Sequence, residues 1–228
     1  MDQTTKLVLF VSLIVLFAGY IVIAVKVDRR RESRRQAALT RVAAELGMGF
    51  TPEDRALVNQ FGGIAFSLPA TSTRATSVMR GTIRGSPVVL LDYHLIMPVG
   101  NNFETLELTV AAFEFASKPL PVFAAEGGQS WSRRLINKAL ADKVIDFHDD
   151  PDFKRYFNVT GDDAQAVRWL LGPDTRSFLK DQRTEWIFRS NGRWLVMYRS
   201  GKRLKPKDYR AFAQEASEVM LVMTGARV

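Results

Sequence analysis

Residues 75–97, ATSVMRGTIRGSPVVLLDYHLIM, hold two apolar segments on either side of a turn. Glycine and proline in the turn, at residues 85–87, interrupt regular structure there. In the second segment every other residue is large and apolar, which is the pattern of a strand with one buried face. The residues on that face are Val89, Leu91, Tyr93 and Leu95. The stretch therefore predicts a β-hairpin.

The same alternation continues after this hairpin, in residues 103–115. The residues on the apolar face of that segment are Leu106, Leu108, Val110 and Ala112. A third strand there would complete an antiparallel meander. Residues 120–126 and 143–149 are predicted to form further strands. A second hairpin is predicted at residues 185–201, where Asn191-Gly192 is a strong turn signal.

Apolar residues at helical spacing predict helices between and after these strands. The predicted helices cover residues 51–61, 130–140, 162–171, 175–182 and 205–223. Thr51 and Asp162 are the expected N-terminal caps of the first and third. The last helix carries an apolar stripe of Tyr209, Phe212, Ala216, Val219, Met220 and Met223, which predicts packing on a sheet. The order of elements favours the α+β class, with a largely antiparallel sheet and flanking helices.

The N-terminal part of the chain has a different character. Residues 7–25 are nineteen residues without a charge. As a helix they would be about 29 Å long, close to the hydrocarbon thickness of a bilayer of about 30 Å. The segment ends in Ile23-Ala24-Val25-Lys26, which is a poor signal-peptidase site. Few core helices of soluble proteins are apolar all round for this length, so a permanent transmembrane helix is predicted.

A basic segment follows the apolar one. Residues 26–41 carry a net charge of +5, whereas Asp2 and Lys6 cancel on the other flank. The positive-inside rule then places residues 1–6 outside the plasma (inner) membrane and the later residues in the cytoplasm. The basic residues expected to contact anionic headgroups are Lys26, Arg29, Arg30, Arg31, Arg34 and Arg35. The predicted domains are an outer N-terminus (1–6), a transmembrane helix (7–25), a juxtamembrane helix ending at a Gly47 stop (26–47) and a cytoplasmic α+β domain (48–228).

Composition excludes several classes of function. The chain of 228 residues has no cysteine, so disulfides, thiolate metal sites and cysteine nucleophiles are absent. The formal net charge of +8 resides mainly in residues 26–41, because residues 42–228 hold 24 basic and 21 acidic groups. This near balance argues against a nucleic-acid-binding domain, and no nucleic-acid partner is predicted.

Two features could serve chemistry. Asp92 and His94 share a strand face, and such a pair could exchange protons with a substrate. Residues 146–150, Asp-Phe-His-Asp-Asp, would alternate carboxylates and an imidazole along one face of a strand, a donor set that suits a hard divalent cation. The common alternatives are an ordinary polar strand residue for His94 and a solvated turn for the acidic run. No nucleophile accompanies either feature, so no catalytic residue, metal or cofactor is predicted.

Other polar segments give weaker signals. No glycine-rich phosphate loop or nucleophile elbow is present in the sequence. Residues 127–134, GGQSWSRR, could hold an anion with Arg133 and Arg134 at a helix start. The basic residues 201–207 could contact lipid phosphates or form a solvated turn.

Residues 150–179 resemble a family of bacterial membrane-anchored proteins of unknown function. The shared pattern, DPxF…V…D…[AV]RxLLxP, falls on Asp150, Pro151, Phe153, Val159, Asp163, Val167, Arg168, Leu170, Leu171 and Pro173. Val167 departs from the alanine that the family favours. The resemblance implies a membrane-attached protein with one soluble domain, and it implies no activity, ligand or catalytic residue.

These observations predict a single-pass membrane protein whose soluble domain binds another protein or the membrane surface and is not an enzyme. The alternative is a membrane-tethered hydrolase or metal-dependent enzyme that uses Asp92 and His94 or the run from Asp146 to Asp150. Arg168 lies on a helix of small and apolar residues, so a structural ion pair with Asp163, or with Asp150, is expected. The lipid bilayer is the one partner that the sequence identifies.

Overall fold

The structure, a computed structural model, describes residues 3–61, 72–99, 102–127, 143–182, 186–199 and 203–225. It divides into two compact units, Met1–Arg41 and Val42–Val228. The second unit begins at Val42, before the predicted domain start at Met48. We call this second unit the domain.

Helix α1, Gln3–Glu45, is the main element of the first unit, and its last turn belongs to the domain. It ends because Gly47 adopts the left-handed conformation, with φ of 67°, and the amide of Met48 bonds back to Ala43 O at 2.8 Å. This is the predicted glycine stop. Among the described residues, no helix has a stretch both long and apolar enough to cross a membrane.

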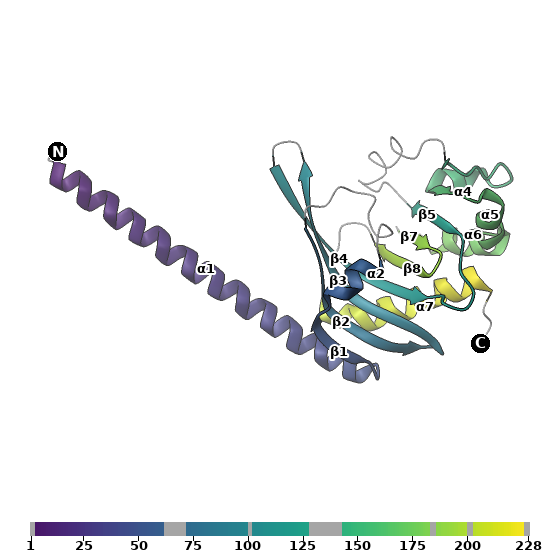
Figure 1. The fold of residues 1–228 in the computed structure, drawn as a ribbon, viewed down its shortest axis with the longest axis horizontal. Coiled ribbons are helices and arrows are strands. Elements are labelled where there is room, and N and C mark those ends of the chain that lie inside the picture. Colours follow the sequence, from purple (N-terminus) through teal and green to yellow (C-terminus); the bar gives the residue numbers. More distant parts are fainter. Residues whose placement is uncertain are drawn as a thin grey trace. The chain divides into compact units, whose positions relative to one another are not determined.

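The domain is built on one antiparallel sheet of eight strands, which confirms the predicted α+β class (Figure 1). The strand order is β1-β2-β3-β4-β8-β7-β5-β6. The strands are β1 Gly49–Glu53, β2 Ser72–Ile83, β3 Ser86–Val99, β4 Asn102–Glu114, β5 Val122–Gly127, β6 Phe157–Gly161, β7 Trp186–Asn191 and β8 Trp194–Arg199. The predicted meander is β2-β3-β4, and the predicted second hairpin is β7-β8.

The β2-β3 turn is shorter than the turn predicted at residues 85–87. Ser86 and Pro87 already belong to β3, so the connection is Arg84-Gly85. Both residues have positive φ, 50° and 78°, as a type I′ turn requires. Such a turn matches the twist of the two strands, and it fixes their register.

One face of the sheet carries the apolar residues that alternation identified. All but one of them are buried in a single cluster, and the exception, Leu106, packs against it. The buried ones are Val89, Leu91, Tyr93, Leu95, Leu108, Val110 and Ala112. Helix α2, Arg55–Gln60, covers part of this face, and Phe61 after it packs edge-on against Trp194 at 5.2 Å between ring centroids. Asp54 caps α2 by accepting from Leu57 N, whereas the predicted cap Thr51 lies in β1.

The opposite face is covered by helix α7, Tyr209–Thr224, which follows a 3₁₀ turn at Pro206–Asp208 (Figure 1). Its predicted stripe from Tyr209 to Met223 is buried throughout. Phe212 stacks on Trp186 of β7 at 5.5 Å between ring centroids, and the Arg199 guanidinium lies over the Trp186 ring at 4.8 Å. Aromatic stacking of this kind adds about 0.5–1.5 kcal/mol to the burial itself.

Among the described residues, three short helices lie beside the β5-β6 end of the sheet (Figure 1). They are α4 Pro151–Tyr156, α5 Ala164–Leu170 and α6 Pro173–Asp181. Asp163 rather than the predicted Asp162 caps α5. Gly172-Pro173 separates α5 from α6, because the residue before a proline avoids the helical conformation.

The strand predicted at residues 143–149 is wrong. Val144 makes a single bridge to Thr160, residues 145–147 have no regular structure, and His148-Asp149 form a turn. The chain leaves the sheet because Asp150 caps α4 by accepting from Phe153 N at 3.0 Å. The helix predicted at 130–140, with Arg133 and Arg134, lies outside the described residues, as do residues 201 and 202 of the 201–207 segment. In the described part of that segment, Arg203 pairs with Asp92 and residues 206–208 form a 3₁₀ turn.

Candidate functional site

The predicted pair of Asp92 and His94 lies on the α7 face of the sheet, inside a network of hydrogen bonds. Asp92 is fully buried. Its carboxylate accepts from Thr109 Oγ1 at 3.0 Å, Tyr209 OH at 2.5 Å and Arg203 Nε at 3.0 Å. Because these groups belong to β4, α7 and the segment before α7, the carboxylate fastens the C-terminal helix to the sheet.

His94 extends this network toward the surface. Its Nδ1 lies 3.0 Å from Glu107 Oε1, and its Nε2 lies 2.8 Å from Thr76 Oγ1. Burial lowers the pKa of His94, and the charges of Arg203 and Arg74 lower it further, against the opposing charges of Glu107 and Asp92. The ring is therefore neutral at neutral pH, with both nitrogens engaged. The arrangement stabilises the fold, and neither Asp92 nor His94 lines either of the two hollows described below.

This geometry predicts a pH dependence of stability. The folded protein binds a proton at His94 less readily than the unfolded chain, whose histidine pKa is near 6.5. The contribution of the neutral His94 ring to the free energy of unfolding is therefore fully present above pH 6.5, and it is lost as the pH falls below that value. The urea midpoint of the native protein should fall between about pH 7.5 and about pH 5.5, and the midpoint of His94→Gln should fall less. Most carboxylates titrate below this range, so the difference between the two proteins reports on His94.

His148 provides the matched control for this prediction. Its side chain is 85% exposed. The variant His148→Gln should keep the pH dependence of the native protein. An equal pH dependence in native protein and His94→Gln would contradict the assignment.

The carboxylates in the run from Asp146 to Asp150 pair with different cations and do not converge on one site. Lys154 Nζ lies 2.9 Å from Asp146 Oδ2, and Lys180 Nζ lies 2.9 Å from Asp150 Oδ1. Asp149 accepts two bonds from Arg176, at 3.0 and 2.5 Å. These hydrogen bonds from Lys154 and Arg176 lower the pKa of Asp146 and of Asp149.

The pKa of Asp150 is lowered as well. Burial alone would raise its pKa, but bonds from Lys180 and the Phe153 amide outweigh burial and lower it. Each carboxylate is thus a structural anion with a protein cation beside it. Among the described residues, no group of three or more His, Asp or Glu side chains could hold a metal ion.

Arg168 has a different partner from the two that were expected. Its Nε donates to the backbone carbonyl of Asp146 at 3.0 Å. Asp163 instead accepts from the amides of Gln165 and Ala166, both at 3.0 Å, because it caps α5. Arg168 therefore ties α5 to the loop before α4, which is a structural role.

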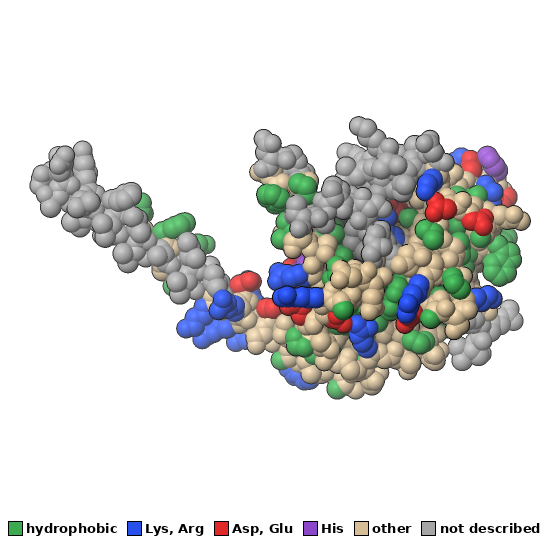
Figure 2. Space-filling model, in the orientation of Figure 1, with side chains coloured by type: hydrophobic (Ala, Val, Ile, Leu, Met, Phe, Trp, Pro, Cys, Tyr) green, Lys and Arg blue, Asp and Glu red, His purple; other side chains and the backbone are tan. Residues whose placement is uncertain are grey.

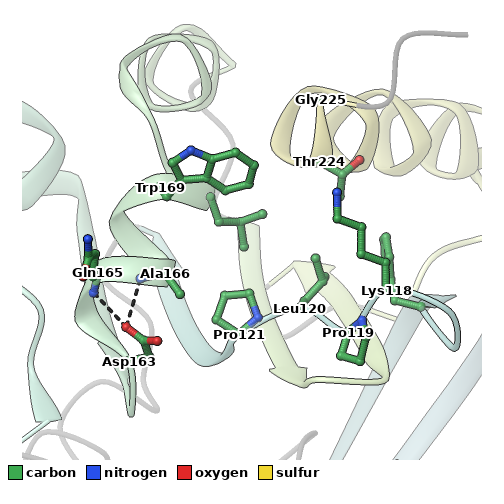
Figure 3. Close-up of a pocket in the computed structure, with 12 residues that line it drawn as sticks. Lys118, Pro119, Leu120, Pro121, Asp163, Gln165, Ala166, Trp169, Thr224 and Gly225 are labelled. Carbon is green, nitrogen blue, oxygen red and sulfur yellow. Dashed lines mark hydrogen bonds between the residues drawn. The ribbon is translucent and has the colours of Figure 1, made fainter.

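A concave surface lies elsewhere, between α5, the end of α7 and the β4-β5 loop (Figure 3). We call it the Trp169 groove. It has a volume of about 810 Å³, within the range of ligand-binding sites. Its lining is mainly apolar and consists of Phe115, Lys118, Pro119, Leu120, Pro121, Asp163, Gln165, Ala166, Trp169, Leu170, Thr224 and Gly225.

The β4-β5 loop forms one wall of the groove and is held firmly. Phe115 N donates to Arg193 O at 2.6 Å, and Leu120 N donates to Gly192 O at 2.8 Å, so the loop is bound to the β7-β8 turn. Pro119 and Pro121 restrict the backbone further, since proline fixes its own φ and keeps the preceding residue extended. A wall ordered in advance lowers the entropy cost of binding.

Trp169 forms the other wall and is 79% exposed. The buried residues here are Val167 and Leu170 on α5 and Leu171 at its C-cap. Trp169 lies two residues after Val167, about 200° around the helix, so it points away from the core. Figure 3 shows its indole above Pro121, with Lys118 pointing toward Thr224. An exposed tryptophan beside rigid proline rings is a typical anchor for a binding partner.

A smaller hollow of about 220 Å³ continues the groove on the α6 side. It shares Trp169, Leu170, Thr224 and Gly225 with the larger one and adds Asp174. The sequence prediction missed this site, although one signal for it was present: a tryptophan opposite the buried stripe of a short helix. The other walls come from distant segments and gave no signal.

The predicted lipid-contact residues lie on α1. Lys26, Arg29, Arg30, Arg31 and Arg34 are exposed, and Arg35 is half-buried. In the domain, acidic and basic side chains are interspersed on the face seen in Figure 2.

The comparisons with known proteins bear on the fold of this chain and not on the groove. No protein-family model matches the sequence, and no curated protein matches it. The crystal structure of the mycobacterial trehalose monomycolate transport factor A, TtfA, is similar to this chain with a TM-score of 0.53 at 14% sequence identity. The similarity covers 85% of this chain and 96% of that chain. At this identity it shows a shared fold.

Proposed function

We propose that residues 7–25 cross the plasma membrane, with residues 1–6 outside and the domain in the cytoplasm. The uncharged length of the segment and the basic residues after it support this. So do the exposed apolar side chains along α1, because large apolar groups left exposed indicate a lipid or protein environment. They are Leu13, Leu16, Phe17, Tyr20 and Ile23, each between 64% and 72% exposed.

The basic residues of α1 from Lys26 to Arg35 would then lie at the cytoplasmic headgroups. Their exposed side chains can bind anionic lipids, each contributing about 1 kcal/mol. This contact fixes the orientation of the anchor, and it leaves the domain available for another partner.

The domain itself is a binding module that does not catalyse a reaction, and the Trp169 groove holds its protein partner. The observation that carries this proposal is the groove itself: an ordered, mainly apolar surface with a 79% exposed tryptophan. The charged clusters around Asp92 and around residues 146–150 are engaged in holding the fold, which is why we assign them no chemistry. The hydrolase alternative has no support in the geometry of either cluster.

We infer a membrane-bound role in lipid transport from the shared fold with the mycobacterial transport factor. A fold of this kind, anchored beside the inner leaflet, suits an accessory protein that holds a transport component in place. The chain would act by binding, and the partner would move the lipid.

The orientation can be tested because the chain has no cysteine. Thr4→Cys should react with a membrane-impermeant maleimide in intact spheroplasts, since residue 4 lies outside in this proposal. Ser177→Cys, on the exposed side of α6, should react only after the membrane is opened. Labelling of Ser177→Cys in intact spheroplasts, or protection of Thr4→Cys, would refute the proposed orientation.

The binding role can be tested by photocrosslinking in native membranes. A benzoylphenylalanine at position 169 should give one discrete adduct, and the same residue at position 103 should not. Phe103 is the matched control, since it is 69% exposed but lies on β4, away from the groove residues. The captured protein should also co-purify with the native chain at least 10-fold better than with Trp169→Ala. Indistinguishable adducts from the two positions would reject the groove as the docking site.

A further inference from the structure

The Trp169 groove carries more negative than positive charge. Asp163 lines the larger hollow and Asp174 lines the smaller one, and Trp169 belongs to both linings. The one cation among the residues that line the two hollows is Lys118, and Figure 3 shows it directed toward Thr224 at the end of α7. A helix C-terminus has a partial negative charge, so Lys118 offsets the dipole of α7 rather than the two carboxylates.

The two carboxylates lie at the N-terminal ends of α5 and α6. Asp163 caps α5 through a single oxygen, Oδ1, which accepts both amide bonds. Asp174 lies in the first turn of α6. The groove and its extension therefore share an apolar centre at Trp169, and each has one acidic residue in its lining. The complement of this surface is an apolar anchor accompanied by cations.

The proposed location of the domain limits where such a partner comes from. Cytoplasmic segments of membrane proteins next to their spans are enriched in Lys and Arg. Aromatic and aliphatic side chains provide the anchors in most peptide-binding grooves. A domain attached to the inner leaflet meets segments of this composition on its neighbours in the membrane.

We propose that the Trp169 groove binds a basic, aromatic- or aliphatic-anchored cytoplasmic segment of an integral membrane protein, an inference that rests on the binding function proposed for the domain. Trp169 contacts the anchor, and Asp163 and Asp174 pair with the flanking cations. The groove thereby selects basic partners and rejects acidic ones, because a carboxylate placed beside Asp163 or Asp174 would be repelled.

The test uses the full-length chain in nanodiscs of phosphatidylcholine, a lipid without net charge that does not attract the probe. The probe is a fluorescein-labelled 15-residue peptide with one tryptophan, leucines at helical spacing and four lysines. A second peptide has four glutamates in place of the lysines. Fluorescence anisotropy should show the lysine peptide binding at least 10-fold tighter than the glutamate peptide.

Variants of the groove distinguish binding in the groove from non-specific binding of the peptide. Trp169→Ala should weaken the lysine peptide at least 10-fold, and this exposed site leaves the fold intact. Asp163→Asn with Asp174→Asn should weaken it about 5-fold and reduce its salt dependence; asparagine caps a helix as well as aspartate does, so α5 is kept. Phe103→Ala should bind like the native chain.

Several results would overturn the proposal. These are equal binding of the two peptides, no effect of Trp169→Ala, or an equal loss in Phe103→Ala. Two further results assign the groove to another occupant: displacement of the peptide by a 16-carbon fatty acid probe in a Trp169-dependent manner, or loss of a dimer of this chain in Trp169→Ala. If the crosslink at position 169 in native membranes persists while the two peptides bind equally, the charge selectivity fails and the binding function stands. If that crosslink is absent, the binding function fails as well.

Discussion

Replacement of Glu126 by alanine is expected to lower the free energy of unfolding by about 3–5 kcal/mol, because it leaves a buried guanidinium without its carboxylate. Glu126 on β5 and Arg189 on β7 form an ion pair whose side chains are 1% and 4% exposed. The two are diagonal neighbours on one face of the sheet, since Glu126 pairs with Ile187.

The charge on Arg189 persists despite its burial. Burial alone would lower the pKa of Arg189, but the influence of Tyr198 and Glu126 outweighs it and the pKa is raised. Its Nε also donates to Tyr198 OH, at 3.3 Å. In Glu126→Ala this hydroxyl remains the guanidinium's neighbour, and a neutral oxygen compensates a buried charge poorly.

The measurement is urea unfolding of the full chain in detergent micelles, followed by tryptophan fluorescence. The double variant Glu126→Leu with Arg189→Met should recover most of the loss, because an apolar pair of similar volume removes both charges together. Arg55→Ala removes an ion pair whose arginine side chain is 89% exposed, and its midpoint should hardly change. A Glu126→Ala midpoint equal to the native one would show that the pair is not buried as described.

Replacement of Asp92 by alanine is the second large effect, also about 3–5 kcal/mol, since it removes the carboxylate that Arg203, Tyr209 and Thr109 share. The loss should be concentrated in α7. Hydrogen exchange of residues 209–224 should accelerate more than that of β2 and β3, because the lost bonds join this helix to the sheet.

His94→Ala is the comparison that separates structure from catalysis. His94 makes its contacts at the edge of the same network, so its loss should cost only about 1–2 kcal/mol. The catalytic alternative requires instead that both variants fold normally and lose an activity. A stable Asp92→Ala protein with unchanged exchange in α7 would contradict the structural role of this carboxylate.

Local patterns predicted the two hairpin-connected parts of the sheet well, and the physical reason is that their strands pair with their neighbours in sequence. The β2-β3-β4 meander and the β7-β8 hairpin need only short turns, so alternation and turn residues determine both the strands and their pairing. The C-terminal stripe from Tyr209 to Met223 was equally readable, because one helix face is buried along its whole length.

Shorter elements escaped prediction for the opposite reason. Strands β1 and β6 have five residues each, too few for a recognisable alternation. Residues 143–149 alternate like a strand, yet the cap and ion pairs of residues 146–150 take this segment out of the sheet. Asp163 rather than Asp162 caps α5, a difference of one residue that composition does not resolve.

The sequence by itself determined the apolar segment 7–25 with its basic flank, the antiparallel α+β class and the strands of the meander, since each depends on contacts local in the chain. Only the tertiary structure decided that β8 pairs with β4, that Asp92 is enclosed by α7, and that Trp169 borders a groove. Those features join residues far apart in sequence: the groove needs the 115–121 loop, α5 and the end of α7 together. Such juxtapositions follow from how whole elements pack, and no single segment encodes them.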